Sequence, residues 1–331
     1  DRSVSRGLGD VYKRQYVDGV KKPADGQLLY RGYDVKDLIR GSSGSRFAFE
    51  EAGYLLLFGE LPTQEKLEEF CRVLGECRTM PTNFTRDVIM KAPSHDIMNS
   101  MARSVLTLAS YDPKAGDLEI SNVLRQSIQL AGIFPMLAVY SYHAYNHYEK
   151  DGSMYIHRPD PELSTAENFL RMLRPDMKYT ELEARVLDVA LLLHAEHGGG
   201  NNSTFTTRVV TSSGTDTYSA MAAALCSLKG PRHGGANLMV NRQLKDILKH
   251  VENPEDDDEV REYLRRILRK QAGDGSGLIY GMGHAVYTIS DPREVVLKQR
   301  ARHLAYDKGF EEEYNMLCSI CLLYTSDAAD D

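Results

Sequence analysis

Three histidines and one arginine in the second half of the chain carry the chemistry that the sequence suggests. They are His197, His233, His284 and Arg293, and each stands near glycine or proline residues that interrupt regular structure. An imidazole changes its charge near neutral pH, and a guanidinium pairs with a carboxylate through two parallel hydrogen bonds. These residue types indicate a site for a small ligand that carries carboxylate and carbonyl groups.

His197 is predicted at the end of a helix. The mostly apolar run Val186–Leu193 has the period of a buried helix, and the three glycines at 198–200 would stop it, because glycine enters the left-handed conformation of a helix C-cap without steric cost. His194 and His197 would then share one face of the last turn. The negative end of a helix favours a charged imidazolium, so His197 would suit an anion such as a carboxylate.

His233 has the opposite setting. It lies in the turn-rich run GPRHGGAN, just before Leu238–Val251, where apolar residues recur at helical spacing. The positive end of a helix disfavours protonation, so His233 is expected to be neutral and to donate a hydrogen bond to a carbonyl. Two histidines in opposed environments indicate two roles.

The third segment, GMGHAVYTISDPR, covers Gly281–Arg293. Gly281 and Gly283 allow the backbone around His284 to approach a ligand closely. The Asp-Pro-Arg ending places the planar guanidinium of Arg293 further along the same segment, where it is suited to bidentate binding of a carboxylate.

Simpler explanations apply to each residue alone. A histidine near a helix end often caps that helix, since helix ends need polar partners. The HAEH spacing could indicate a metal, but zinc sites gather three or four ligands and none cluster here, so we expect no metal site. His143 and His147 in YSYHAYNHY could also bind metal, although an amphipathic packing face fits the interleaved aromatic residues better.

Taken together and in this order, the segments EHGGGNNS, GPRHGGAN and GMGHAVY with DPR resemble the citrate synthase family. The YRGY at 30–33, before a short predicted helix, is similar to the N-terminal region of that family. The resemblance implies condensation of acetyl-CoA with oxaloacetate and water to give citrate and CoA. That reaction requires removal of a proton from a weakly acidic thioester methyl group and stabilisation of the enolate oxygen.

The resemblance also implies roles for single residues. His233 would hydrogen-bond the thioester carbonyl as the enol forms, and His284 would polarise the ketone of oxaloacetate. His197 and Arg293 would hold the dicarboxylate. The backbone positions expected near CoA are Gly281, Met282, Gly283 and Ala285.

The fold implied by the resemblance is all-α, with a large helical domain at 16–237 and a smaller helical domain at 238–320. The smaller domain is expected to close over the larger one and to exclude water from the enolate. In the family, the region of the Ala-rich run Tyr218–Leu228 contributes to a dimer interface, so a homodimer is expected. No cofactor is expected besides acetyl-CoA as co-substrate.

Two departures from the family pattern bear on activity. The general base of the family is an aspartate on a later segment, and no matching segment precedes Ile320, so the smaller domain is expected to be truncated and this chain to be inactive. Several family members carry a basic residue four positions after the histidine of GHAV, where this chain has Thr288, so one phosphate contact to CoA is in doubt.

Two other functions stay open. A 2-methylcitrate synthase would use the same residues with propionyl-CoA, and one methylene in a pocket gives only about 1–3 kcal/mol of discrimination. A non-catalytic protein that binds an acyl-CoA or a dicarboxylate on this scaffold is the second alternative, because the base is expected to be missing.

The two ends of the chain have the pattern of non-native sequence. Asp10–Gln15 (DVYKRQ) can be encoded by a DNA string whose reverse complement, read one base along, encodes Cys321–Ser326 (CLLYTS). We therefore interpret 1–15 and 321–331 as adapter-like, non-native tails and exclude them from fold reasoning. The CxxC that ends at Cys321 crosses such a junction, so no redox or metal motif is inferred there.

The composition argues against several classes of partner. The formal net charge is −7 at pH 7, which argues against a nucleic-acid partner, since that would require a basic face. No apolar run approaches 18 residues, so no membrane partner is expected. The remaining cysteines have no framework spacing, which favours reduced thiols and a cytoplasmic protein.

Helical periodicity dominates the rest of the chain, and strand signals are scarce. Pro135 should kink or break a long helix at Asp117–Tyr148, because its ring removes a hydrogen bond. The Val- and Thr-rich run Thr204–Ser213 would be a strand by propensity alone, whereas the family resemblance implies a helix there. We expect the helix.

Overall fold

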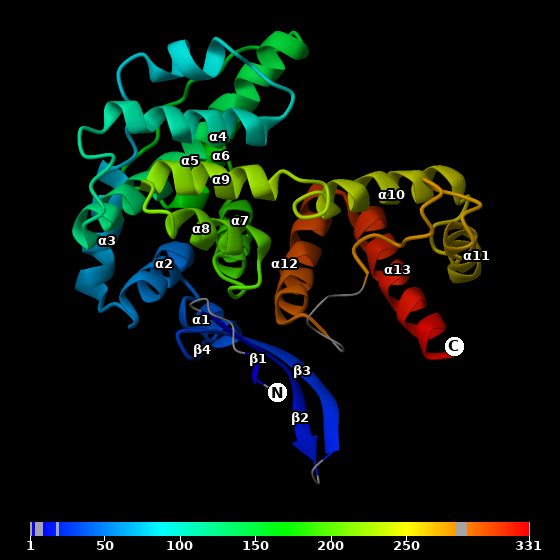
Figure 1. Cartoon of the computed structure of the whole chain (residues 1–331). Coiled ribbons are helices and arrows are strands. Elements are labelled where there is room, and N and C mark those ends of the chain that lie inside the picture. Colours follow the sequence, from blue (N-terminus) through cyan, green and yellow to red (C-terminus); the bar gives the residue numbers. More distant parts are fainter. Residues whose placement is uncertain (1, 4–8, 18–19, 283–289, 331) are drawn as a thin grey trace.

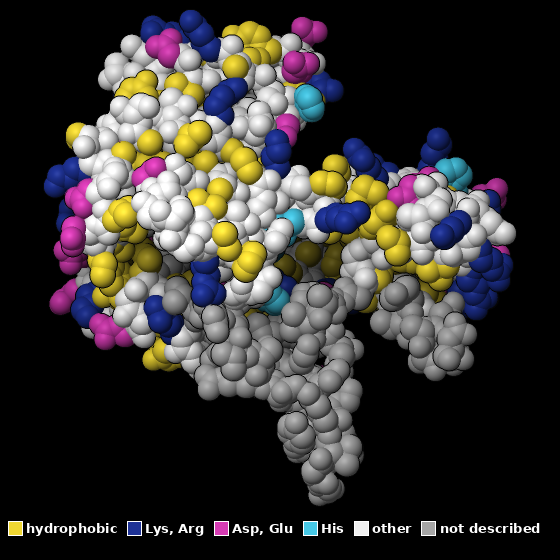
Figure 2. Space-filling model, in the orientation of Figure 1, with side chains coloured by type: hydrophobic (Ala, Val, Ile, Leu, Met, Phe, Trp, Pro, Cys, Tyr) yellow, Lys and Arg dark blue, Asp and Glu magenta, His cyan; other side chains and the backbone are white. Residues whose placement is uncertain are grey.

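The computed structural model describes residues 2–3, 9–17, 20–282 and 290–330, with side chains described for 25–282 and 290–323. Nearly all regular structure in these residues is helical, which confirms the predicted all-α class. A larger helical body stands beside a smaller one, and a two-stranded ribbon projects from the larger body (Figure 1). The outline of the molecule is indented between the two bodies (Figure 2).

The larger body contains the helices from the first part of the chain. These are α1 (Val35–Gly41), α2 (Ala48–Phe58), α3 (Gln64–Glu76), the π-helix Thr85–Met90, α4 (Ile97–Leu108), the short 3-10 turn Ala109–Tyr111, α5 (Ile120–Glu149), α6 (Thr165–Leu173), α7 (Glu181–His194), α8 (Asn202–Thr211) and α9 (Thr217–Leu228). The smaller body contains α10 (Ala236–His250), α11 (Asp257–Leu268) and α13 (Glu311–Asp330). Between them lies α12 (Pro292–Lys308), beside α7 (Figure 1).

A small antiparallel sheet precedes the helices. It is built in the order β1 (Arg2–Ser3), β2 (Gly9–Val17), β3 (Val20–Tyr30) and β4 (Tyr33–Asp34). The end of β3 is anchored by Leu28 and Tyr30, both fully buried, whose alternation matches the two-residue period of a strand. Asp34 then caps α1, its side chain accepting the amide of Lys36 at 2.8 Å.

Three buried apolar clusters form the interiors of the two bodies. One joins α4, α5 and α9. The second joins β3, α1, α2 and α7, and Val296 and Leu297 of α12 pack against it. The third belongs to the smaller body and joins α10, α11 and α13 around Ile247, Ile267 and Met316. The predicted boundary between 16–237 and 238–320 stays a prediction, as do the tails at 1–15 and 321–331.

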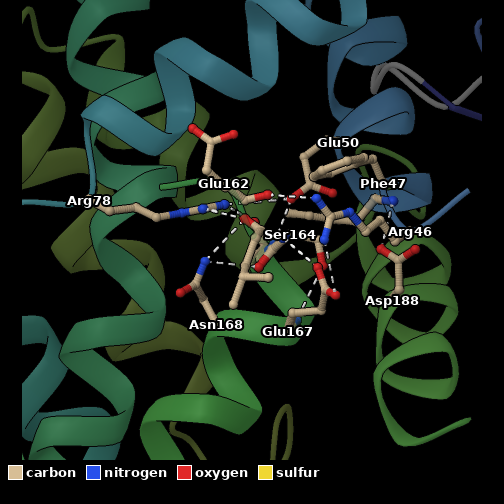
Figure 3. Close-up of polar contacts among 12 residues, drawn as sticks. Arg46, Phe47, Glu50, Arg78, Glu162, Ser164, Glu167, Asn168 and Asp188 are labelled. Carbon is tan, nitrogen blue, oxygen red and sulfur yellow. Dashed lines mark hydrogen bonds and ion pairs between the residues drawn. The ribbon is translucent and has the colours of Figure 1, made fainter. Parts of the chain in front are cut away.

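A buried polar network ties α2, α6 and α7 (Figure 3). Asp188 of α7 accepts the amides of Ala48 and Phe49 at 2.9 and 3.0 Å, and so caps α2 from a distant part of the chain. Glu50 of α2 accepts the amide of Thr165, the first residue of α6, at 2.7 Å. These contacts fix the register of three helices of the larger body.

Two predictions about helices are settled by the structure. α5 runs unbroken through Pro135, so the expected break is absent. The run after Asn201 is the helix α8, as the family resemblance implied and against its strand propensity. Asn201 caps it, because its side chain accepts the amides of Ser203 and Thr204.

Candidate active site

The segment that carries His197 lies beyond the end of α7. The helix stops at His194, with Ala195 as its C-cap. The prediction that His194 and His197 share the last helical turn, and that the glycines end the helix, is therefore wrong. The cause is Tyr30 of β3, whose hydroxyl donates to the carbonyl of Leu192 at 2.9 Å and accepts the amide of Glu196 at 3.2 Å. That carbonyl and amide are the pair that would extend the helix.

Beyond Glu196 the chain turns towards α8. The Glu196 carboxylate accepts the amide of Gly198, and Gly198 has a φ of 85°, a left-handed conformation that favours glycine. His197, between them, is partly buried. Asn201 then starts α8 as its N-cap. His197 is thus held in a short irregular segment between two helices, and its predicted role no longer rests on a helix terminus.

His233 lies in consecutive turns before α10, which begins at Ala236. Its Nε2 atom is 2.8 Å from the hydroxyl oxygen of Ser203 in the first turn of α8. The same hydroxyl lies 3.2 Å from the carbonyl oxygen of Ala224 in α9. Sequence reasoning missed Ser203 as a partner, although it is the last residue of the EHGGGNNS segment.

Arg293 lies in the first turn of α12. Asp291 caps that helix by accepting the Arg293 amide at 2.9 Å, and its carboxylate also pairs with the guanidinium at 2.6 Å. Both side chains are largely buried, with exposed fractions of 19% and 16%. The helix that Arg293 begins, α12, packs against α7 and β3.

Gly281 and Met282 stand at the edge of the smaller body. Gly281 has a φ of 83°, and a Cβ added to it would lie 2.8 Å from a methyl group of Val240 in α10. The position therefore requires glycine. Met282 packs against the apolar cluster of the smaller body. Gly283, His284 and Ala285 lie outside the described residues, as does Thr288, so their roles stay predictions.

Other histidines serve local structure. His194 is exposed, and its Nδ1 lies 2.6 Å from the carbonyl oxygen of Ala190. His143 is buried against the carbonyl of Met172 at 3.0 Å, and burial lowers its pKa. His147 is exposed and contacts the carbonyl of Gly152.

Among the described residues, no group of three or more side chains is placed to bind a metal ion. None of the described helices is long and apolar enough to cross a membrane.

The contacts of the described site residues involve two pairs of elements. Ser203 of α8 contacts His233. Tyr30 of β3 bonds the segment of His197, and α12, which carries Arg293, packs against α7 and β3. The segment at 195–201 links the two pairs, because it runs from the end of α7 to the start of α8.

Known proteins resemble this chain in sequence and in fold. A sequence profile described as citrate synthase, C-terminal domain, matches residues 11–327. Citrate synthase of Haloferax volcanii is 33% identical over 328 residues, which cover 96% of this chain and 78% of that protein. The 2-methylcitrate synthase of Shewanella oneidensis is 32% identical over 293 residues, which cover 87% of this chain and 70% of that protein.

A solved structure agrees with the sequence comparisons. Citrate synthase of Thermoplasma acidophilum, in a ternary complex with carboxymethyl coenzyme A and oxaloacetate, superposes with a TM-score of 0.72 at 26% identity. The superposition covers 88% of this chain and 71% of that one. The chain therefore belongs to the citrate synthase family.

Proposed function

We propose that the protein is a citrate synthase that joins the acetyl group of acetyl-CoA to the ketone carbon of oxaloacetate, with hydrolysis to citrate and CoA. The observation that carries this proposal is the hydrogen bond between Ser203 and His233, beside the segment of His197. It supplies an oriented imidazole next to a candidate carboxylate site. The proposal agrees with the ligands named for the Thermoplasma acidophilum enzyme.

His233 is proposed as the donor to the thioester carbonyl. The Ser203 hydroxyl has one proton, which it can donate either to Nε2 of His233 or to the carbonyl of Ala224. Donation to Nε2, across the shorter contact, leaves the imidazole proton on Nδ1. Nδ1–H can then stabilise the enolate oxygen that forms when the acetyl methyl group loses a proton.

His197 and Arg293 are proposed to hold the carboxylates of oxaloacetate. The Asp291 carboxylate now occupies the guanidinium of Arg293, with contacts of 3.0 and 3.2 Å to Nε and 2.6 Å to Nη2. In this pairing the guanidinium donates to both oxygens of the carboxylate, the bidentate geometry that it would offer a ligand. His284 is proposed to polarise the ketone, and the backbone at 281–285 to lie against CoA.

Binding is the direct test of the proposal, because the assigned residues are those that would hold the two substrates. We expect oxaloacetate to bind in isothermal titration calorimetry and acetyl-CoA to bind more tightly in its presence. Release of free thiol from a mixture of the two reports the condensation itself. Absence of oxaloacetate binding at millimolar concentration would refute the proposal.

A second candidate is 2-methylcitrate synthesis from propionyl-CoA. It is favoured by the identity of 32% to the Shewanella oneidensis 2-methylcitrate synthase, close to the 33% of the citrate synthase comparison. Thiol release from acetyl-CoA and from propionyl-CoA, each measured with oxaloacetate, separates the two activities.

We also propose that the protein is a cytoplasmic homodimer. α8 exposes Phe205 and Val209, 58% and 51% exposed, four positions apart on one helical face. Leu106 of α4, 53% exposed, adds to the apolar surface of neighbouring helices. A second copy would cover such a surface. Light scattering should give twice the mass of the chain, and Phe205→Glu should lower it towards the monomer.

A further inference from the structure

The hydroxyl of Tyr30 occupies an unusual place in the molecule. In a continuing helix the amide of Glu196 would donate to the carbonyl of Leu192. Instead, the Tyr30 hydroxyl stands between the two groups, donating to the carbonyl at 2.9 Å and accepting from the amide at 3.2 Å. Tyr30 precedes Glu196 by 166 positions, so a strand from the start of the chain determines where α7 ends.

The Tyr30 hydroxyl is buried in the core and keeps its proton. Tyr30 is fully buried, in the apolar cluster that joins β3, α1, α2 and α7. Burial raises the pKa of the Tyr30 phenol to about 12, so it remains neutral near physiological pH and can donate and accept at the same time. The hydroxyl therefore acts by its position and does not respond to pH in the physiological range.

The groups around the hydroxyl belong to the candidate site. Glu196 is adjacent to His197, and its carboxylate holds the amide of Gly198. Ala195, next to Glu196, and Val296 and Leu297 of α12 pack against the apolar cluster that contains Tyr30, and α12 packs against both α7 and β3. One phenol therefore lies where the segment of His197 meets the start of α12.

We propose that Tyr30 is a positioning residue for the dicarboxylate site, whose hydroxyl holds 195–198 out of the helix so that His197 and Arg293 serve one ligand. The inference rests on the proposed function, since it concerns oxaloacetate. Without the hydroxyl, the amide of Glu196 would lose this acceptor and could donate to the carbonyl of Leu192, which also accepts the amide of Ala195 at 3.2 Å. Pairing would extend α7 and rotate His197 to another direction.

Tyr140 offers a matched control. It is also buried, its hydroxyl donates to the carbonyl of His157 at 2.7 Å, and burial raises its pKa to about 12. It lies in the other apolar cluster of the larger body. Tyr30→Phe and Tyr140→Phe thus each remove one buried hydroxyl and its bond to a carbonyl, and a purely structural cost would be similar in both.

The experiment measures oxaloacetate affinity by calorimetry and, without ligand, hydrogen exchange of the peptide that covers 190–201. We expect Tyr30→Phe to weaken oxaloacetate binding by about tenfold or more and to change exchange at 195–198 by a similar factor. Tyr140→Phe should change neither, although both variants lose thermal stability.

Two results would overturn the inference. One is unchanged oxaloacetate affinity in Tyr30→Phe, whatever happens to exchange. The other is an equal loss of affinity in Tyr140→Phe, which would show a general effect of stability. If the unsubstituted protein fails to bind oxaloacetate, the proposed function falls together with the inference. The two failures are distinguishable, because a failure of the proposed function is seen in the unsubstituted protein, whereas a failure of the inference is seen only in the variants.

Discussion

At the scale of single residues, the proposed chemistry depends on side chains that hold other side chains. His233 is aligned by Ser203, and Arg293 is aligned by Asp291, which also caps its helix. Ser203 contacts Nε2 of His233 and leaves Nδ1 for a ligand. Asp291, in contrast, occupies the guanidinium that is proposed to meet a carboxylate. An imidazole and a guanidinium held in this way lose less freedom on binding.

Ser203→Ala tests the alignment of His233. Without the hydroxyl the imidazole is no longer restricted to one tautomer, and we expect the nitrogen-15 NMR shifts of His233 to move towards a mixture of the two forms. Affinity for acetyl-CoA in the presence of oxaloacetate should fall by about five- to tenfold. The control is Ser227→Ala in α9, because the Ser227 hydroxyl is buried without a hydrogen-bond partner. Identical NMR shifts in Ser203→Ala and the unsubstituted protein would contradict the assignment.

Arg293→Lys tests the carboxylate site. Lysine keeps the positive charge but loses the planar fork, so oxaloacetate binding should weaken by about 10- to 100-fold in calorimetry. Arg302→Lys, at an exposed position of the same helix, should bind like the unsubstituted protein. Retained affinity in Arg293→Lys would mean that the charge alone matters, and the bidentate role would be rejected.

At the scale of elements, the larger body depends on buried polar groups that join helices. The Glu50 side chain is almost fully buried, one of its oxygens has no hydrogen-bond partner, and Arg78 approaches the other at 3.8 Å. Burial raises the pKa of Glu50 despite Arg78. Burial, with the nearby Glu50 carboxyl, also raises the pKa of Asp188 to about 7. Both carboxyl groups therefore have a higher pKa in the folded protein than in the unfolded chain.

Stability should consequently fall as pH rises. Between about pH 4, where an unfolded aspartate ionises, and about pH 7, the folded protein binds more protons than the unfolded one through Asp188. In Glu50→Gln, which cannot ionise, we expect the loss of unfolding free energy between pH 5 and pH 8 to shrink by about 1–2 kcal/mol.

Urea denaturation at the two pH values measures this change. Glu68→Gln, an exposed position on α3, serves as the control and should leave the pH dependence unaltered. An unchanged pH dependence in Glu50→Gln would show that the carboxyl pair is ionised throughout the range.

At the scale of the whole molecule, the two bodies have separate interiors among the described residues. The cluster around Ile267 in α10, α11 and α13 shares no buried member with the clusters of the larger body. The smaller body meets the larger one mainly through α12, which contacts α7 and α13. This arrangement is compatible with the predicted closure of a smaller domain over the site, since α12 carries Arg293 at its start.

Ile267→Ala tests the independence of the two interiors. Loss of the fully buried side chain should destabilise the smaller body by about 2–5 kcal/mol. Hydrogen exchange should rise in α10, α11 and α13, while α4 and α5 keep their protection. Ile133→Ala, at an equally buried position of α5, should give the reverse pattern. Uniform loss of protection in both variants would show that the two bodies unfold as one.

The sequence by itself determined the family, the helical class and the segments that carry the candidate site. Helical periodicity and the glycine-rich motifs are local signals, so they could be read without a structure. Local propensity was insufficient at 204–213, where β-branched residues favour a strand. There the family resemblance, and then the Asn201 cap, gave the helix.

Only the tertiary structure decided where α7 ends, which hydroxyl meets His233, and that a sheet precedes the helices. A pattern places the end of a helix at the nearest glycine, but the hydroxyl of Tyr30 breaks the helical hydrogen bond before the glycines are reached. The contact between Ser203 and His233 likewise joins positions 30 residues apart. Such contacts form because segments that are distant in the sequence pack together. The local sequence around either residue therefore does not predict them.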